Sequence, residues 1–505
     1  MTKKARVIIM RCDDYDADLI SRIVSDGMRH LDVRPQGRVL IKPNTVIAHP
    51  RLFPHAFTRK EFLEGVIMAI NAISGLVSGS TSGSTSGPIS GPISGPTSRL
   101  ITELAVGERC GITIPTRFAF KHAGYGPVLR RHRVKTYYFE ETAQVPVAVS
   151  RQMMTHRDHV MVPKPVADCE FFINLPKFKA HPWTRLTLGL KNYIGIQDDR
   201  YRLIDHNQFL EHKIADLQQV IQPKFIAIDA ISAGQRMMLT PTPFPMGAIV
   251  MGTNACAVDA VGCHMVNVDP VEIPHIRFAS ERGIGPIDLA DIAVEGDFPL
   301  SEIQEKNRTF EFYLKHIDHS FGSNANLQCT VGTFPEKYSP DYCWGGCPGA
   351  LQEAVHILKA YSPDVLHRMG KIRYVVGNVA GPLDVAPDET VLFVGDCTRW
   401  RGKIDGMPVH IKSTYGRQKK RNNHRPPSND MLLKNMKTIA NCMANRRKRV
   451  IRVPGCPVSV ADHVHYLSFF GGVTNPNFDR RMVVDVNMQY MKMTAGRIKN
   501  RLFQD

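Results

Sequence analysis

Four of the eleven cysteines in this sequence lie where a loop meets a regular element. Cys343 and Cys347 lie in CWGGCPG just before a predicted helix, while Cys397 and Cys456 end the apolar runs VLFVGDC and RVIRVPGC. A glycine shortly before each of the last two lets the backbone come close to a bulky group. Because the carboxyl ends of parallel strands open onto one crevice, we expect these four thiols to converge there.

Four thiolates are soft ligands that suit an iron–sulfur cubane or zinc. Structural zinc sites typically use closely spaced pairs of cysteines, and only the first two of these four are close in sequence. We therefore expect a [4Fe–4S] cluster, with zinc as the alternative. The other cysteines are expected to be small buried side chains: Cys12, Cys110, Cys169, Cys256, Cys263, Cys329 and Cys442.

A second group of reactive side chains follows the apolar run CEFFINL, in the segment NLPKFKAHPWTRLTLGLKNYIG. Cations and amides at the end of a strand can hold an anionic substrate. A histidine there suits acid–base work, because its pKa lies near neutrality. We predict catalytic roles for four side chains of this segment: Lys177, Lys179, His181 and Lys191. The alternative is a solvated cationic loop with one structural histidine.

Six further residues are predicted to bind the substrate: Lys42, Asn44, Glu108, Arg185, Asn192 and Asp259. Most of them follow predicted strands, and strand ends of one parallel sheet converge on a shared edge, where they form a pocket. Asp259 lies instead on a predicted helix, and its alternative is an exposed helical position. With so many candidates, the sequence does not single out one catalytic base.

Strands and helices must alternate to bring these groups together. Apolar, β-rich runs occur at ARVIIM, RVLIKPN, CEFFINL, KFIAIDAI and GAIVMG, and helical patterns cover 16–31, 61–73, 212–220 and 255–266. This alternation predicts an α/β fold with a largely parallel sheet covered on both faces. A second alternation begins near residue 342, with a helix over 348–361 and strands at IRYVVGN, TVLFVGDC and RVIRVPGC.

The chain is therefore predicted to contain two domains. We expect a first α/β domain over 1–320, a linker over 321–341 and a smaller α/β domain over 342–505 that carries the cysteine cluster. Five tetrapeptides of Ser, Gly and a variable pair fill 78–98, and this composition predicts a flexible surface insertion. A basic, loop-rich insertion is expected over 399–449, with its second part helical.

The composition is that of a globular protein, with 43% apolar and 22% charged residues among 505. No run approaches the ~20 apolar residues of a membrane helix, and the first residues lack the features of a secretory signal. We therefore expect a cytoplasmic protein whose reduced cysteines serve ligation, catalysis or burial. The formal charge of +17 attracts anionic partners, but no nucleic-acid-binding motif accompanies it, so a nucleic-acid partner is not expected.

The N-terminal segments resemble the family called domain of unknown function 362. The matching pieces span about 38–297 and include VLIKPN, NLPKFKAH, TLGLKNYIG and NACAVDAVG. Members of that family often carry iron–sulfur ligands, which implies cluster binding here. A serine usually follows Gly-Glu in the family's first block, whereas this chain has Arg109 and Cys110. A fainter similarity joins NLPKFKAH and GLKNYIG to the nickel-pincer lactate racemases.

The trio CWGGCPG, GDC and VPGCP, within about 340–470, resembles the proximal-cluster motif of nickel–iron hydrogenase small subunits and of the related subunit of respiratory complex I. The resemblance implies a flavodoxin-like domain in which Cys347, Cys397 and Cys456 ligate a [4Fe–4S] cluster. Cys343 departs from the pattern, because three residues separate it from Cys347 here, against two in the hydrogenases and none in complex I.

These features predict an iron–sulfur oxidoreductase or electron-transfer component that acts on an anionic small molecule or a protein redox partner. Two alternatives stay open. One is a non-redox lyase or isomerase with a structural cluster. The other is an assembly or scaffold protein that docks an acidic partner through the basic residues of 417–449.

Overall fold

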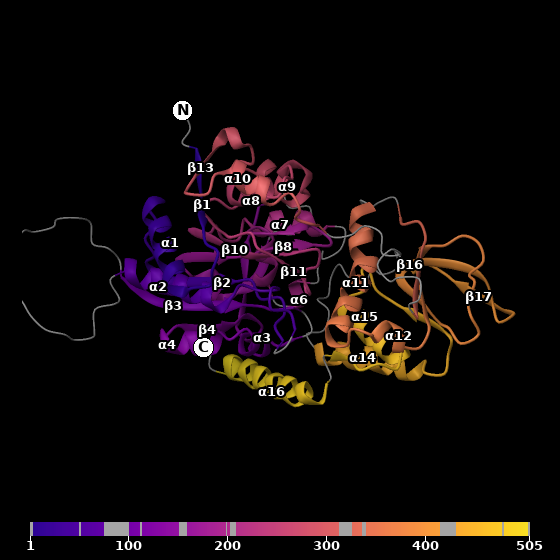
Figure 1. Ribbon diagram of the computed structural model, residues 1–505. Helices are drawn as coiled ribbons and strands as arrows, with labels where there is room; N and C mark the ends of the chain where they lie inside the picture. The colour runs from indigo at the N-terminus through magenta and orange to yellow at the C-terminus, as the bar shows by residue number, and fades with distance from the viewer. Residues whose placement is uncertain are drawn as a thin grey trace, which may run out of the picture.

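The computed structural model describes residues 4–49, 52–74, 100–111, 114–150, 159–197, 199–202, 209–312, 326–335, 340–414, 431–476 and 479–502. Within them the chain forms a first region (residues 4–312) and a second region (residues 326–502), each with its own main sheet (Figure 1). The expected mixed α/β fold with a largely parallel sheet is confirmed. The predicted insertion over 78–98 lies outside the described residues, as does the basic stretch 415–430.

The first region is built on an eleven-stranded sheet whose main path runs β13-β1-β12-β10-β7-β2-β3-β4. Its strands are β1 (Ala5–Arg11), β2 (Gly37–Pro43), β3 (Ile101–Glu108), β4 (Lys135–Tyr138), β7 (Phe171–Leu175), β10 (Phe225–Gln235), β12 (Ala248–Gly252) and β13 (Ile292–Glu295). Among these described strands only β12 runs antiparallel to its neighbours. The carboxyl ends of β10, β7, β2 and β3 therefore meet at one edge.

Five shorter strands complete the first region. β8 (Lys177–His181) and β11 (Thr242–Phe244) pair with β10, and β9 (Arg185–Thr187) pairs with β8. β5 (Gln144–Ala148) and β6 (His159–Pro163) form a separate antiparallel pair. The segment with the predicted catalytic cations thus forms a small hairpin, β8–β9, on top of the strand-end edge.

Helices cover both faces of the first sheet, as its buried strands require. Val39 and Ile41 pack with α1 (Ala17–His30), α2 (Lys60–Ile73), α3 (Thr116–His122) and α4 (Tyr125–Arg131). Leu40 points the other way, as alternation along a strand dictates, into the cluster that contains residues of the remaining helices. These are α5 (Lys164–Asp168), α7 (Leu210–Leu217), α8 (Ala255–His264), α9 (Pro274–Glu281) and α10 (Leu300–Lys306).

Short helical turns connect these elements. They are α6 (Asp199–Arg202) and four 3-10 helices, η1 (Phe139–Glu141), η2 (Lys191–Ile196), η3 (Pro270–Glu272) and η4 (Leu289–Asp291). Asp16 caps α1 by accepting the N–H of Leu19, and Asn254 caps α8 by accepting that of Ala257. Such side-chain caps satisfy backbone donors that a helix start leaves open.

The second region contains a five-stranded sheet: β14 (Leu327–Val331), β15 (Ile372–Asn378), β16 (Thr390–Ile404), β17 (Met407–Ile411) and β18 (Val450–Val453). β14, β15, β16 and β18 lie side by side in sequence order and are all parallel. A flavodoxin-like sheet would have the order 2-1-3-4-5. The described strands do not follow that order, because β15 pairs with both β14 and β16, whereas the second strand of a flavodoxin-like sheet lies at its edge.

The two faces of the second sheet are covered by different elements. Figure 1 shows α11 (Pro340–Tyr361), α12 (Val365–Arg368), α14 (Met431–Ala444) and α15 (Val460–Phe470) on the side of the first region. The far half of β16 turns into an antiparallel hairpin with β17, and Trp400 stacks on Phe393 at 5.5 Å between ring centroids. The expected loop-rich insertion therefore begins with a β-hairpin, and the linker expected over 321–341 contains β14.

Two elements of the second region reach across to the first. Glu353 of α11 is fully buried and accepts the backbone N–H groups of Met238 and Leu239, the latter at 3.2 Å. The last helix, α16 (Arg480–Leu502), lies along the first region, where Asp485 accepts hydrogen bonds from Lys121 and His122 at 2.9 and 2.8 Å. No helix in the described part of the chain combines the length and the apolar character needed to cross a bilayer.

Replacing Glu353 with alanine tests the contact between the regions. The change leaves two buried N–H groups without an acceptor, and each such group costs about 1–3 kcal/mol. We expect Glu353→Ala to lower the free energy of unfolding in urea by about 2–4 kcal/mol. Glu305→Ala, which removes an exposed carboxylate of α10, serves as the control and should leave stability nearly unchanged. A Glu353→Ala protein as stable as this control would contradict the contact.

Candidate functional site

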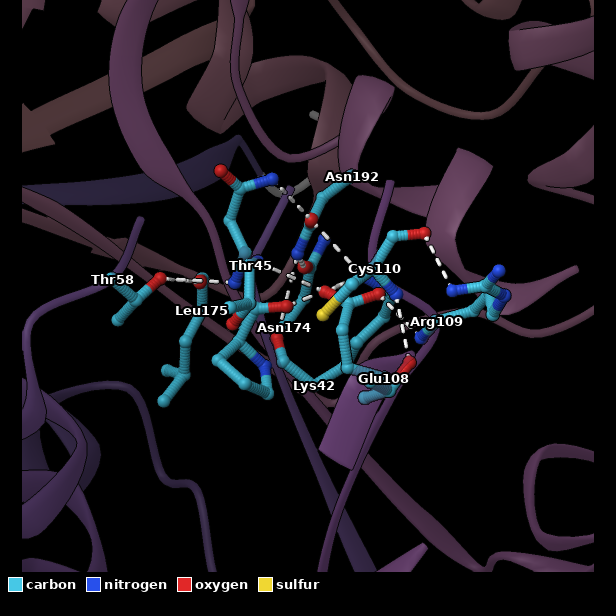
Figure 2. A network of polar contacts seen from close by, with 12 residues as sticks. Lys42, Thr45, Thr58, Glu108, Arg109, Cys110, Asn174, Leu175 and Asn192 are labelled. Carbon is cyan, nitrogen blue, oxygen red and sulfur yellow. Dashed lines mark hydrogen bonds and ion pairs between the residues drawn. The ribbon is translucent and has the colours of Figure 1, made fainter. Parts of the chain in front are cut away.

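The carboxyl ends of β2 and β3 carry a buried ion pair (Figure 2). Lys42 Nζ lies 2.8 Å from Glu108 Oε2, and the two side chains are 0% and 2% exposed. The strands are paired neighbours, so their ends lie side by side. Glu108 also accepts the backbone N–H groups of Thr45 and Arg109, at 3.2 and 2.9 Å. One carboxylate thus holds the loops that follow both strands.

Asn192 of η2 lies at the centre of the same network (Figure 2). Its Oδ1 accepts hydrogen bonds from Lys42 and Asn44, each at 3.0 Å, and its Nδ2 donates to Asn174 Oδ1 at 2.8 Å. Asn174 in turn donates to the carbonyl oxygen of Gly189 at 2.9 Å. These amides fasten the loop after β9 onto the ends of β2 and β7.

Burial is the largest influence on the ionisation of the Lys42–Glu108 pair. It lowers the pKa of Lys42 and raises the pKa of Glu108, and the charge of each partner opposes the shift of the other. Both side chains are almost fully buried, so the short contact between the two groups must take the place of much of their solvation.

Next to this network lies a cavity of about 290 Å³ between the two regions. Its lining includes these members of the predicted site: Lys42, Asn44, Glu108, Lys179, His181, Lys191 and Asn192. Cys456 and Pro457 line it from the second region, together with the start of α15. The cavity is the place where predicted substrate-binding groups and one predicted cluster ligand meet.

Two lysines and a histidine face this cavity from the segment after β7. Burial lowers the pKa of Lys179 and of Lys191 to about 7, and the charge of Lys191 further lowers that of Lys179. His181 Nδ1 accepts the backbone N–H groups of Trp183 and Thr184 at 3.1 and 3.3 Å. The neutral imidazole therefore carries its proton on Nε2. The cavity holds groups that can bind an anion and deliver a proton.

Lys177 does not line the cavity. Its Nζ lies 2.9 Å from Asp229 Oδ1 and 2.7 Å from the hydroxyl of Tyr15, all in the buried interior beside β10. Lys177 begins β8 whereas Lys179 and His181 follow it toward the cavity, and an extended strand separates alternate residues by about 7 Å. The sequence placed all three on one strand face but could not show where the cavity ends.

Arg185 and Asp259 also lie outside the cavity lining. Arg185 has φ +58° at the start of β9 and forms an exposed ion pair with Glu272 at 2.7 Å. Asp259 is wholly buried on α8, where it accepts the backbone N–H groups of Gly189 and Leu190 at 2.7 and 2.8 Å. Neither of the two residues lines the cavity, and Asp259 instead holds the turn before η2.

Cys347 and Cys397 converge on Gly395. A β-carbon on this glycine would lie 3.3 Å from Cys347 Sγ and 3.8 Å from Cys397 Sγ. Gly395 has φ +90°, in the left-handed range that favours glycine. The backbone N–H of Val458 points at Cys347 Sγ from 3.5 Å. The backbone at Gly395 thus leaves a space without a side chain beside two thiols and one backbone N–H donor. This space is called the cradle of Gly395 below.

Cys343 and Cys456 belong to the same group of thiols. Partial burial, together with a smaller contribution from the charge of Cys397, raises the pKa of each to about 12. Burial also raises the pKa of Cys347, with added contributions from the other three sulfurs. All four are therefore close enough to influence one another's ionisation.

Cys343 and Cys347 lie within α11 and not in a loop before it, because that helix begins at Pro340 and not at Pro348. Residues four apart lie on one face of a helix. The spacing of three intervening residues, which departs from the hydrogenase pattern, is therefore compatible with both sulfurs facing the same side.

A single metal ion and an iron–sulfur cluster require different spacings between the ligating thiols. Within the described ranges, no three His, Cys, Asp or Glu side chains are placed to hold a single metal ion. Zinc, with bonds of 2.3 Å, draws its thiolates to about 3.8 Å from one another. A cubane presents four separate iron corners and so takes thiolates that stand further apart. The four thiols are soft ligands that suit either group.

Sequence analysis missed part of the cavity lining. Arg109 and Arg202 line it, and Arg202 donates to the backbone carbonyl oxygens of Arg109 and Cys110. The one signal in the sequence was that Arg109 stands where the family usually has a serine. The apolar wall also went unpredicted, because it comes from elements far apart in the sequence: Met238, Leu239, Ile357, Val460 and Val464.

Comparison with known proteins supports the N-terminal resemblance. Residues 94–264 match the family model described as Domain of unknown function (DUF362). The match lies within the expected span of 38–297 but covers only part of it. The chain is also 27% identical over 156 residues to Thylakoid-associated protein sll1697 of Synechocystis sp., a match that covers 29% of this chain and 47% of that protein. The chain thus spans about half the length of this curated relative.

Among solved structures, the lactate racemase apoprotein from Thermoanaerobacterium thermosaccharolyticum is similar at 8% sequence identity and a TM-score of 0.32. The match covers 91% of this chain and 94% of that chain.

A double-mutant cycle tests the buried pair. Glu108→Gln leaves the Lys42 charge buried without its partner, and removal of one member of such a pair costs about 3–5 kcal/mol. The combined variant Lys42→Met/Glu108→Leu leaves no buried charge, so chemical denaturation should show a smaller loss than for Glu108→Gln. The exposed pair of Arg11 and Glu302 is the control, and Glu302→Gln should have little effect. A combined variant whose loss of stability equals the sum of the losses from its two single changes would contradict this account.

The lowered pKa of Lys179 predicts a dependence of stability on pH. Its folded pKa of about 7 lies below the roughly 10.4 of an unfolded lysine, so between these values the unfolded chain binds more protons. Stability should therefore rise with pH in that window, by up to about 1.4 kcal/mol per pH unit for one group. Wild type should gain stability relative to Lys179→Met in urea titrations between pH 6 and pH 9. Parallel curves for the two proteins would show that Lys179 is charged in the folded state.

Proposed function

We propose that this chain is an iron–sulfur protein that binds one [4Fe–4S] cluster through Cys343, Cys347, Cys397 and Cys456. The observation that carries the proposal is the convergence of these thiols around the cradle of Gly395. Thiolates are the usual ligands of such clusters. The resemblance of CWGGCPG, GDC and VPGCP to the proximal-cluster motif supports the same assignment.

Such a cluster supplies one-electron transfer when it is bound. The chain would hold it by thiols of different exposure: Cys347 is 8% exposed, whereas Cys456 is exposed. The N–H of Val458 donates toward the sulfur of Cys347, and hydrogen bonds to ligating sulfur are one of the means by which proteins tune such centres.

The proposed role is that of an oxidoreductase or electron-transfer component acting on an anionic substrate or protein partner. The cavity supports this role because Cys456 and the cations Lys179 and Lys191 all line it. The lysines would bind and orient the anion. His181, with its proton on Nε2, would donate a hydrogen bond to a bound group within reach. The apolar residues of α15 would exclude water.

Anaerobic purification followed by metal analysis tests the proposal. We expect a brown protein with a broad absorbance near ~400 nm and about four irons per chain, as for a thiolate-bound cubane. Cys347→Ser and Cys397→Ser should each lose most of the iron and the absorbance. Cys329→Ser, which changes a half-buried thiol on β14 away from the cradle, is the matched control and should retain both.

A colourless protein that retains stoichiometric zinc would contradict the cluster. Equal iron loss from the Cys329→Ser control would show that the effect comes from a general failure of folding and not from ligation. Circular dichroism of each variant separates these outcomes.

A further inference from the structure

The cavity between the two regions has walls of unlike chemistry. All of its charged side chains come from the first region. The second region contributes Cys456, Ser459 and a set of apolar side chains: Ile357, Pro457, Val460, Ala461 and Val464. The hydroxyl of Ser459 is engaged at the start of α15, where it donates to Asp462 Oδ2 at 2.6 Å and accepts the N–H of that residue. The second region therefore presents a mainly apolar surface.

The opposite wall carries positive charge that the carboxylates of Glu353 and Glu211 offset only in part, without an ion pair among the described residues. Lys42 is paired with Glu108. Lys179 donates to the carbonyl oxygen of Ala56 and forms no ion pair, and Lys191 makes neither a hydrogen bond nor an ion pair within the described residues. A cation removed from water without a counter-charge is costly. An anionic group beside these two lysines would therefore be stabilised strongly.

The first region also contributes apolar residues to the lining, and these are fixed before any ligand arrives. Met238 and Leu239 line the cavity and are each 8% or less exposed. Their backbone N–H groups are held by the buried carboxylate of Glu353 on α11. A wall held in this way does not need to be ordered on binding, and such preorganisation favours affinity.

The size of the cavity limits the ligand. Its volume of about 290 Å³ lies near the lower end of the ~300–1,000 Å³ typical of small-molecule sites. The ligand is therefore a small molecule and not a peptide or a nucleotide with several phosphates.

We propose that this cavity binds a small amphipathic organic anion, a monocarboxylate whose head pairs with Lys179 and Lys191 and whose hydrocarbon body packs against α11 and α15. The assignment names the substrate class of the cavity and rests on the proposed function for its role in turnover. A second charged group at the far end of the ligand would lose its hydration against the apolar wall, so the site discriminates against dianions.

Three compounds with the same chain length test the contributions of the ligand's charged head and its hydrocarbon body separately. The full chain, purified anaerobically with its cluster, is titrated by calorimetry with octanoate, octanedioate and octan-1-ol. Octanoate is expected to bind at least about tenfold more tightly than either of the others, because only it satisfies both walls. Equal affinity for octanoate and octanedioate would overturn the proposal.

Variants then test which part of the ligand each wall of the cavity contacts. Lys191→Met should weaken octanoate binding by about tenfold and leave octan-1-ol unchanged, because only the head pairs with the lysine. Val464→Thr keeps the side-chain shape and should weaken both compounds; should it unfold, Ala461→Ser makes the same test. Lys403→Met removes an exposed lysine of the β16–β17 hairpin and should change neither affinity. Unchanged octanoate affinity in Lys191→Met would overturn the assignment.

Iron content and absorbance near ~400 nm, measured on the same samples, keep the two proposals apart. If the protein contains its cluster but does not discriminate among the three compounds, only the proposal of an amphipathic anion is contradicted. A protein without iron that still prefers octanoate contradicts the iron–sulfur proposal alone.

Discussion

The covering of the first sheet's strand ends by the second region is the constraint on which the rest of this structure depends. Groups at those ends would otherwise be fully solvated, but residues of α11 and α15 line the same cavity, and many of the strand-end groups are buried. Each polar group must then find its partner within the protein. Lys42, Glu108 and Asn192 meet this requirement through mutual contacts of 2.8 to 3.0 Å.

The same covering gives the remaining groups their chemical character. Lys179 and Lys191 line the cavity, where burial outweighs the opposing charges of Glu353 and Glu211 and brings the pKa of each lysine to about 7. Cys456 lies at the boundary between this space and the cradle of Gly395. An electron carrier at the cradle and a substrate in the cavity would thus share one wall, which ties the two halves of the proposed function to a single interface.

The second region is organised around that interface. Its parallel strands follow one another in sequence order, so the helices that connect them gather on the face toward the first region. The other face is covered by the β16–β17 hairpin with Trp400. Glu353 and α16 fasten the region in place by binding to the loop after β10 and to α3. This arrangement brings thiols from α11, β16 and the loop after β18 to one point.

The sequence by itself determined the alternation of strands and helices, because periodicity and β-branched runs are local properties. It also determined which polar groups stand at strand ends, and Lys42, Asn44 and Glu108 meet there for that reason. Only the tertiary structure decided that Asp259 holds a turn, that Arg185 faces solvent, and that α11 begins before Cys343. It alone also supplied the apolar wall, since Leu239 and Val464 become neighbours only through packing between regions that no local pattern encodes.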